Sequence, residues 1–140
     1  MNNEAQMKWS AYGFDEIDAR LLHDILRLRI DVFVVEQNCP YPELDGLDLE
    51  ALHVIGRDPH GRPVAYCRII PPHEDGLPHI GRVVVDKSRR GERLGKQLIA
   101  EALRAVERTY GRRQCALAAQ RHLQVFYEAF GFRAIGEAYL

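Results

Sequence analysis

The 140-residue chain has few cysteines and no long apolar run. Its three cysteines, Cys39, Cys67 and Cys115, are odd in number and include no Cys-x-x-Cys pair. This spacing argues against a disulfide scaffold and a zinc site, and it predicts reduced thiols in a cytoplasmic protein without a metal. The sequence contains no run of about 18 apolar residues and no apolar N-terminal segment, so we expect neither a membrane span nor a secretion signal.

The chain also lacks an excess of positive charge. It carries 19 Lys and Arg against 20 Asp and Glu, which gives a formal net charge of −1. Domains that bind nucleic acid usually carry a basic excess that matches the phosphate backbone. We therefore expect no nucleic-acid partner, and we expect local basic clusters to serve a small anionic ligand.

No internal repeat or low-complexity linker divides the chain, and its length is that of one ordinary domain. We predict a single domain over 1–140. Periodicity and turn residues predict this order of elements: strand 7–12, helix 17–28, strands 53–57, 63–70 and 80–85, helix 94–110, strand 114–119, helix 122–130 and strand 132–140. Consecutive strands followed by alternating helices and strands predict an α+β domain with a mixed sheet and helices packed on it.

Two predictions concern charged residues in the N-terminal half. The apolar stripe of helix 17–28 leaves Arg27 and Arg29 off its buried face. Four acids follow the helix: Glu43, Asp45, Asp48 and Glu50. Their spacing differs from that of an EF-hand, which also needs a terminal Glu. We interpret them as a solvated acidic loop that can attract a cationic substrate.

The most informative segment is the basic, glycine-containing turn at 89–98, between a predicted strand and a predicted helix. Free N–H groups at a helix N-terminus and the helix dipole form an anion site suited to phosphate. Gly91 and Gly95 have no Cβ, so a ligand can approach the backbone closely. Four cationic side chains surround this point: Arg89, Arg90, Arg93 and Lys96. The alternative is a solvated basic turn that caps an amphipathic helix.

A nucleotide hydrolase is excluded by the spacing within this turn. The run Gly91-Glu92-Arg93-Leu94-Gly95-Lys96 is only weakly similar to a P-loop. A P-loop has four residues between its glycines and a Ser or Thr after the Lys, whereas this run has three, followed by Gln97.

Together, the strand and turn resemble a known family motif. Val83-Val84-Val85-Asp86 followed by Arg90-Gly91-Glu92-Arg93-Leu94-Gly95 resembles the acyl-CoA-binding motif of the GNAT acyltransferase superfamily. The segment 117–132, with Phe126-Tyr127 and a final Gly131-Phe132, resembles that family's closing motif. The segment 28–41 is similar to the ElaA-type branch. The resemblance covers nearly the whole chain and implies the GNAT fold, a twisted mixed sheet of six or seven strands with helices on both faces.

The resemblance implies an acyl-CoA-dependent N-acyltransferase. Such an enzyme moves an acetyl group from acetyl-CoA to a primary amine of a small molecule or peptide, by direct attack in a ternary complex. The family also allows a homodimer. The implied cofactor-binding residues are Val83, Val84, Val85, Arg90, Gly91, Glu92, Arg93, Leu94, Gly95, Lys96 and Gln120.

The resemblance bears on three individual residues. Tyr127 corresponds to the general acid that protonates the departing thiolate, a role suited to a phenol that keeps its proton at neutral pH. Its alternative is an aromatic core position. Gln120 either contacts the cofactor or caps the end of a strand. Arg93 stands where the family pattern has glycine, which is tolerated if its backbone angles are those of an ordinary helix.

The general base is not assigned by the resemblance, because the family's Glu position is Gly81 here. Glu36, His53 and His79 remain as candidates. Glu36 lies in an apolar run and needs a partner or a role. We expect it to be catalytic and to face an acceptor cleft between the first helix and the loop 38–48. Its alternative is an ion pair with one of three arginines: Arg27, Arg29 or Arg68. His53 is expected to be structural.

Two other functions stay open at this stage. One is a non-catalytic module that binds acyl-CoA or a protein partner. The other is an acyltransferase similar to autoinducer synthases, which use acyl carrier protein and S-adenosylmethionine, because Arg29-x-x-Val32-Phe33 resembles part of that group. The chain is short for the second possibility.

Overall fold

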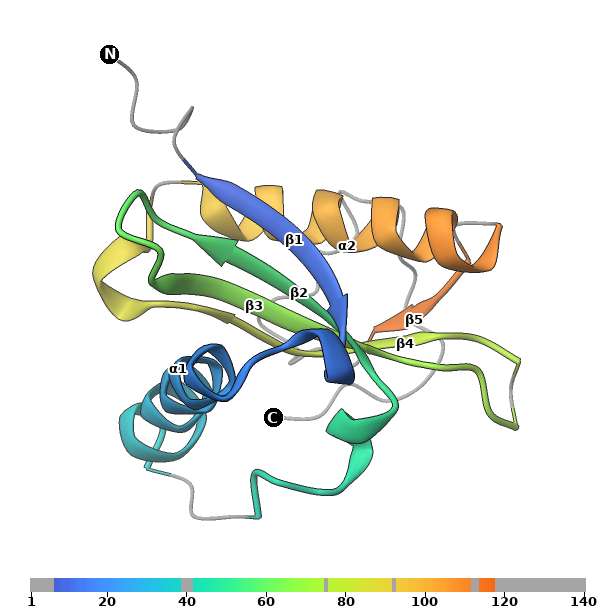
Figure 1. Ribbon diagram of the computed structural model, residues 1–140, viewed down its shortest axis with the longest axis horizontal. Coiled ribbons are helices and arrows are strands. Elements are labelled where there is room, and N and C mark those ends of the chain that lie inside the picture. Colours follow the sequence, from blue (N-terminus) through green and yellow to red (C-terminus); the bar gives the residue numbers. More distant parts are fainter. Residues whose placement is uncertain (1–6, 39–41, 75, 92, 112–113, 118–140) are drawn as a thin grey trace.

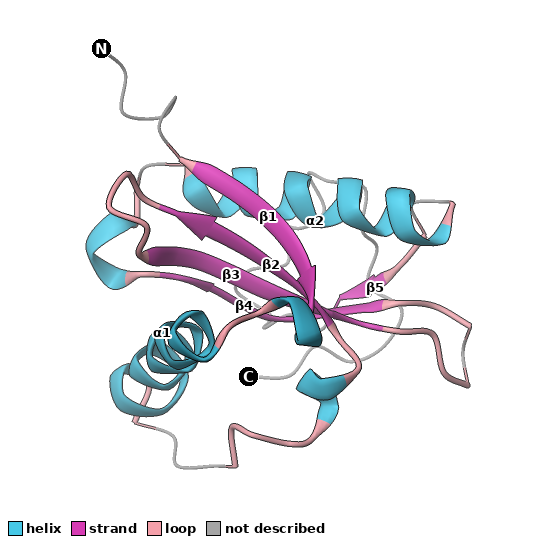
Figure 2. Ribbon diagram, in the orientation of Figure 1, coloured by secondary structure: helices cyan, strands magenta, loops and turns pink. Residues whose placement is uncertain are grey.

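The computed structural model describes residues 7–38, 42–74, 76–91, 93–111 and 114–117. These residues form a five-stranded sheet with the order β1-β2-β3-β4-β5, in which the first four strands pair antiparallel and β5 pairs parallel to β4. One helix lies against each face of the sheet (Figures 1 and 2). The elements are β1 (Lys8–Gly13), α1 (Ala19–Ile30), β2 (Leu52–Arg57), β3 (Pro63–Ile70), β4 (His79–Val85), α2 (Leu94–Tyr110) and β5 (Ala116–Leu117).

These elements lie close to where the sequence predicts them, and the α+β class with a mixed sheet is confirmed. The predicted helix 122–130 and strand 132–140 lie outside the described residues. The five strands counted above therefore belong to the described part of the chain. Within that part, no helix combines the length and the hydropathy that a membrane crossing requires.

Alternation along β3 divides the interior into two layers. Ala65, Cys67 and Ile69 pack with the buried face of α2, whereas Tyr66 packs with α1. Successive side chains of a strand point to opposite faces, so the next residue on the α1 side is Arg68. The α1 face of the sheet is therefore where polar residues enter the interior.

Local signals set the ends of both helices. The Asp18 side chain accepts a hydrogen bond from the Leu21 N–H at 2.8 Å and caps α1. Gly111, with φ of 80°, ends α2 and donates its N–H to the Glu107 carbonyl at 2.9 Å. After α1 the chain continues as a π-helix over Asp31–Glu36, a conformation that occurs frequently at functional sites.

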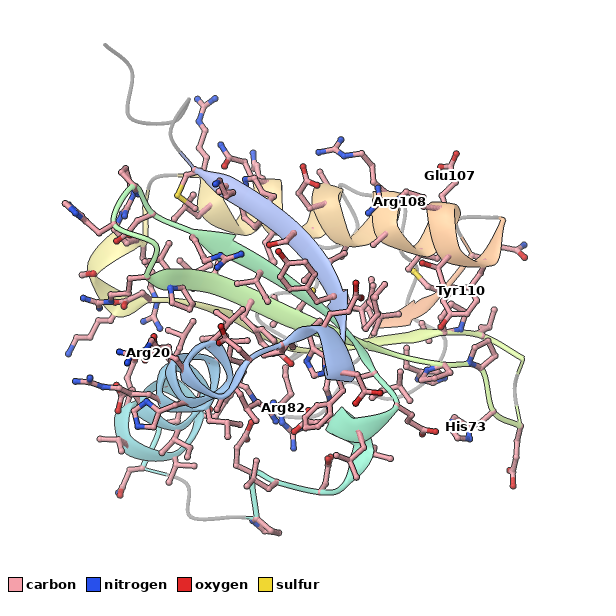
Figure 3. The ribbon with its side chains drawn as sticks, viewed as in Figure 1. Arg20, His73, Arg82, Glu107, Arg108 and Tyr110 are labelled. Carbon is pink, nitrogen blue, oxygen red and sulfur yellow. The ribbon has the colours of Figure 1, made fainter. Side chains whose placement is uncertain are left out.

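A β-bulge interrupts β4 in the middle of the sheet. Tyr66 pairs with Val84 and Arg68 pairs with Gly81, so Arg82 and Val83 both stand opposite Cys67. Arg82 takes up the extra length in a left-handed conformation with φ of 51°. The bulge directs the Arg82 side chain to the α1 side of the sheet, away from Glu107 and Arg108 of α2 (Figure 3).

Candidate functional site

The turn that follows β4, residues 86–91, is called the cofactor turn after the role that the sequence predicts for it. Its first residue is fixed to the hairpin between β2 and β3, because the Asp86 N–H donates to the Val64 carbonyl at 2.8 Å and Arg62 pairs with the Asp86 carboxylate at 2.7 Å. Asp86 also accepts from the Ser88 N–H and hydroxyl, both at 2.9 Å. Gly91 has φ of 90° and open space around its Cβ position. The turn is thus ordered at its start and free of side-chain obstruction at Gly91.

The start of α2 has the properties of an anion site. Arg93 is the N-cap residue, and its side chain makes no capping hydrogen bond. The first N–H groups of this 17-residue helix therefore receive no cap from the side chain of their N-cap residue. Arg93 and Lys96 are exposed there and make no ion pair within the described part of the chain. The amides and the two charges together suit a phosphate group.

The backbone conformation of Arg93 is not the helical one expected from the sequence. Tolerance of a side chain at this family glycine position requires ordinary helical angles, but Arg93 has φ of 64° and ψ of 14°, which is left-handed. A non-glycine residue in this conformation carries a strain of about 1 kcal/mol or more.

Replacing Arg93 by glycine is expected to raise the free energy of unfolding by about 0.5–1 kcal/mol, because glycine adopts positive φ without steric cost. Denaturant unfolding measures the change as a higher midpoint at constant slope. Arg93→Ala is the matched control: it removes the same charge and keeps the Cβ, so it should not stabilise the protein. Equal midpoints for the glycine and alanine variants would contradict the strain at Arg93.

Glu36 lies against the cofactor turn. Its carboxylate accepts two hydrogen bonds from Arg90, Nη1 to Oε2 at 2.6 Å and Nη2 to Oε1 at 3.0 Å. An ion pair was the expected alternative role of Glu36, and Glu36 does form one. Its partner is Arg90, 54 residues away in sequence, and not Arg27, Arg29 or Arg68, which lie against other acids. The hydrogen bonds from Arg90 lower the pKa of Glu36. They argue against its predicted role as a general base, because a carboxylate with a lowered pKa is a weaker base.

A groove of about 660 Å³ lies beside this ion pair. Its walls come from α1 and the π-helix on one side and from the β2–β3 hairpin and Asp86–Lys87 on the other. Four basic and four acidic side chains line it: Arg20, Arg27, Arg62, Lys87, Asp24, Asp31, Glu36 and Asp86. Glu36 therefore borders this groove together with the hairpin. The predicted cleft between the first helix and the loop 38–48 stays a prediction, because residues 39–41 lie outside the described residues.

The valines of β4 lie between the two layers. Val84 is buried among the residues that pack with α1, and Val83 and Val85 are half-buried on the α2 side. The pairing of β4 with β5 is described only at His79 and Ile80. Contact between the valine backbone and a ligand therefore stays a prediction. Glu92, Gln120 and Tyr127 lie outside the described residues.

Six charged residues form what we call the ionic cluster on the α1 side of the sheet: Arg29, Glu43, Asp45, Asp48, Arg68 and Arg82. Asp48 Oδ1 accepts from Arg29 at 2.9 Å and from Arg68 at 3.0 Å. Glu43 Oε2 accepts from Arg29 at 2.6 Å and from Arg82 at 3.0 Å. The cluster joins α1, the loop after the π-helix, β3 and the β4 bulge.

The cluster corrects two predictions. Arg29 is fully buried, although helical spacing placed it off the buried face, and Glu43 and Asp48 are buried rather than solvated. Three arginines compensate three carboxylates in the cluster. Burial raises the pKa of Asp48, but the hydrogen bonds and charges of Arg29 and Arg68 keep it below its usual value. The cluster was not predicted from the sequence. One available signal was Arg68, which stands within an otherwise apolar strand.

His53 is structural, as expected. Its Nε2 lies 2.9 Å from the Asp48 carbonyl and its Nδ1 lies 2.6 Å from the Tyr66 hydroxyl. A carbonyl can only accept, so Nε2 donates and a neutral ring accepts from Tyr66 at Nδ1. Burial lowers the pKa of His53, which favours this neutral form. With both nitrogens bonded inside the protein, His53 has no free atom for a substrate proton.

Comparisons with known proteins place the fold of this chain among the acetyltransferases. A family model described as an acetyltransferase (GNAT) domain matches residues 32–140. Protein ElaA of Escherichia coli is 40% identical over 136 residues, which are 95% of this chain and 88% of ElaA. The crystal structure of that protein matches with a TM-score of 0.89 and 38% identity, over 96% of this chain and 92% of the other. An acyl-CoA N-acyltransferase from Pseudomonas aeruginosa matches with a TM-score of 0.89 and 40% identity, over 96% and 91%.

Proposed function

The chain belongs to the GNAT acetyltransferase family, in its ElaA-type branch, and from this premise we propose that it transfers an acetyl group from acetyl-CoA to a primary amine. The observation that carries the proposal is the cofactor turn with the uncapped start of α2. The amides at the start of α2, together with Arg93 and Lys96, supply donors and positive charge for a pyrophosphate. No other group of the described residues offers the same combination next to the valines of β4.

In the proposed reaction, the amine attacks the thioester carbonyl directly within a ternary complex. The C–N bond forms, the C–S bond breaks, and no protein nucleophile takes part. Tyr127 donates a proton to the departing thiolate, and the backbone near Val83 polarises the carbonyl. The amine loses its proton to water rather than to Glu36 or His53, because both groups are held by hydrogen bonds within the protein. Positioning the two reactants supplies most of the rate enhancement.

The acceptor is a small molecule or a peptide amine. The loop before β2 is not expected to attract cationic acceptors, because its acids at 43, 45 and 48 are paired with arginines of the ionic cluster. A test panel should therefore include amines with apolar and neutral bodies as well as polyamines, amino acids and peptide N-termini.

Calorimetry with acetyl-CoA and with ATP tests the cofactor assignment. We expect acetyl-CoA to bind and ATP to bind much more weakly, because ATP lacks the pantetheine arm that the β4 backbone would pair with. Thiol release in the presence of the amine panel then measures turnover. Equal affinity for the two ligands, or no binding of acetyl-CoA, would overturn the proposal. Binding without turnover on any amine would favour the alternative of a non-catalytic acyl-CoA-binding module.

A further inference from the structure

Every nitrogen of the Arg90 guanidinium is engaged. Nη1 and Nη2 donate to the two oxygens of Glu36, and Nε lies 3.3 Å from the carbonyl of Val85, the last residue of β4. This fork-shaped contact fixes the plane of the guanidinium as well as its position. Arg90 therefore ties the far end of the cofactor turn both to the strand before it and to the segment that carries Glu36.

The π-helix sets the position of Glu36. Gln37 donates its N–H to the carbonyl of Val32 at 3.2 Å, five residues back, and this wider turn closes directly after Glu36. A π turn holds more residues than an α turn, so it rotates the residues after it around the helix axis. Val32 packs with the sheet, while Glu36 at the end of the π-helix faces outward to meet Arg90.

The cofactor turn is thus fastened at both ends. Asp86 is bound to the β2–β3 hairpin through Arg62 and Val64, and Arg90 is bound to the π-helix through Glu36. Arg93 and Lys96, which follow the turn, make no ion pair within the described ranges. The charge for a phosphate can come from these two side chains while Arg90 keeps its contacts.

We propose that Glu36 is a positioning residue for the cofactor turn: through Arg90 it holds the turn in the shape that binds the acetyl-CoA pyrophosphate, without touching cofactor or amine. This inference rests on the proposed function. It gives Arg90 a structural role in the turn and assigns the phosphate contacts to the amides, Arg93 and Lys96. A change in the position of the π-helix that carries Glu36 would therefore change the affinity for acetyl-CoA.

Glu36→Gln tests the proposal, because it keeps the size of the side chain and removes its charge. An exposed ion pair is worth up to about 1 kcal/mol, which corresponds to about a fivefold change in Kd. We expect the Kd and the KM for acetyl-CoA to rise about three- to fivefold. The kcat at saturating acetyl-CoA, its pH profile and the KM for the amine should stay unchanged. Unchanged or tighter acetyl-CoA binding would overturn the proposal, and so would a lower kcat with the acidic limb of the pH profile lost.

Two further variants test whether the turn is held by the two-pronged contact of Arg90 or by its charge alone. Arg90→Lys keeps the charge but cannot make the two-pronged contact, so we expect it to weaken acetyl-CoA binding as much as Glu36→Gln does. The double variant should be no weaker than either single one, because both changes break the same link. Full affinity in Arg90→Lys would overturn the proposal. The control is Glu101→Gln, which removes a half-buried acid from Arg104 on α2 and should leave the Kd unchanged.

Hydrogen exchange without ligand gives a readout that does not depend on the proposed function. The amides of 87–91 should exchange at least about threefold faster in Glu36→Gln than in the unmodified protein, while those in the middle of α2 keep their rates. Unchanged exchange in the turn would overturn the holding role of Glu36. If the unmodified protein binds no acetyl-CoA, the proposed function fails, and the exchange rates still decide whether Glu36 holds the turn.

Discussion

Replacing Arg29 by methionine is expected to lower the free energy of unfolding by about 3–5 kcal/mol, the scale for removing one partner of a buried ion pair. Arg29 is fully buried and donates to Glu43 and Asp48 at 2.6 and 2.9 Å. Methionine fills much of the space without charge, so one carboxylate charge of the ionic cluster stays buried without its counterion. Urea unfolding followed by circular dichroism measures the loss at constant slope.

Arg27→Met is the matched control for this variant. Arg27 lies two residues earlier on the same helix, its side chain is 75% exposed, and its distance to Asp31 is 4.0 Å. Its replacement should change the free energy of unfolding by less than about 0.5 kcal/mol. Adding Glu43→Gln to Arg29→Met restores the balance of charge and should recover part of the loss. A loss below about 1 kcal/mol for Arg29→Met would show that the cluster does not stabilise the fold.

Replacing Tyr127 by phenylalanine is expected to lower kcat by roughly 100-fold or more and to leave acetyl-CoA affinity nearly unchanged. The expectation follows from the family's closing motif at 117–132, where Tyr127 precedes Glu128-Ala129-Phe130-Gly131-Phe132. A positioned acid typically contributes about 10²–10⁴-fold. Steady-state thiol release with the best amine measures kcat, and calorimetry measures the affinity.

Tyr110→Phe controls for the loss of a tyrosine hydroxyl elsewhere in the protein. Tyr110 is half-buried at the end of α2, and its replacement should leave kcat unchanged. Full kcat together with a lower Tm in Tyr127→Phe would make Tyr127 an aromatic core residue. The proposed mechanism would then lack its acid, while the acetyl-CoA site would remain.

The parts of the fold that the sequence predicted are those with a local cause. Apolar residues at helical spacing marked α2, and Gly111 marked its end. Turn residues at 58–62 marked the hairpin between β2 and β3, which the pairing of these two strands confirms. The turn between β4 and α2 was predicted for the same reason, since Gly91 and the basic residues around it are adjacent in the chain.

The parts that the sequence did not predict depend on contacts between distant residues. Arg29 binds two acids, Glu43 and Asp48, which lie 14 and 19 residues later in the sequence. Arg82 binds Glu43, which lies 39 residues earlier. Periodicity within a helix cannot indicate such partners, so it placed Arg29 on the wrong face. The pair of Glu36 and Arg90 spans 54 residues and has the same cause.

The ionic cluster has a consequence for how the loop before β2 tolerates mutation. Its acids point inward to arginines, whereas Leu44 and Leu49 are 59% and 66% exposed. A redesign guided by hydropathy would retain the leucines as a core and treat the acids as replaceable surface. In this loop the order is reversed: polar replacements at Leu44 and Leu49 remove exposed apolar area at little cost to stability. Neutral replacements at Glu43 and Asp48 instead remove carboxylate partners from the buried Arg29 and Arg68. A screen for soluble variants would therefore retain variants changed at the apolar positions of this loop. Variants changed at its buried acidic positions would fail the screen.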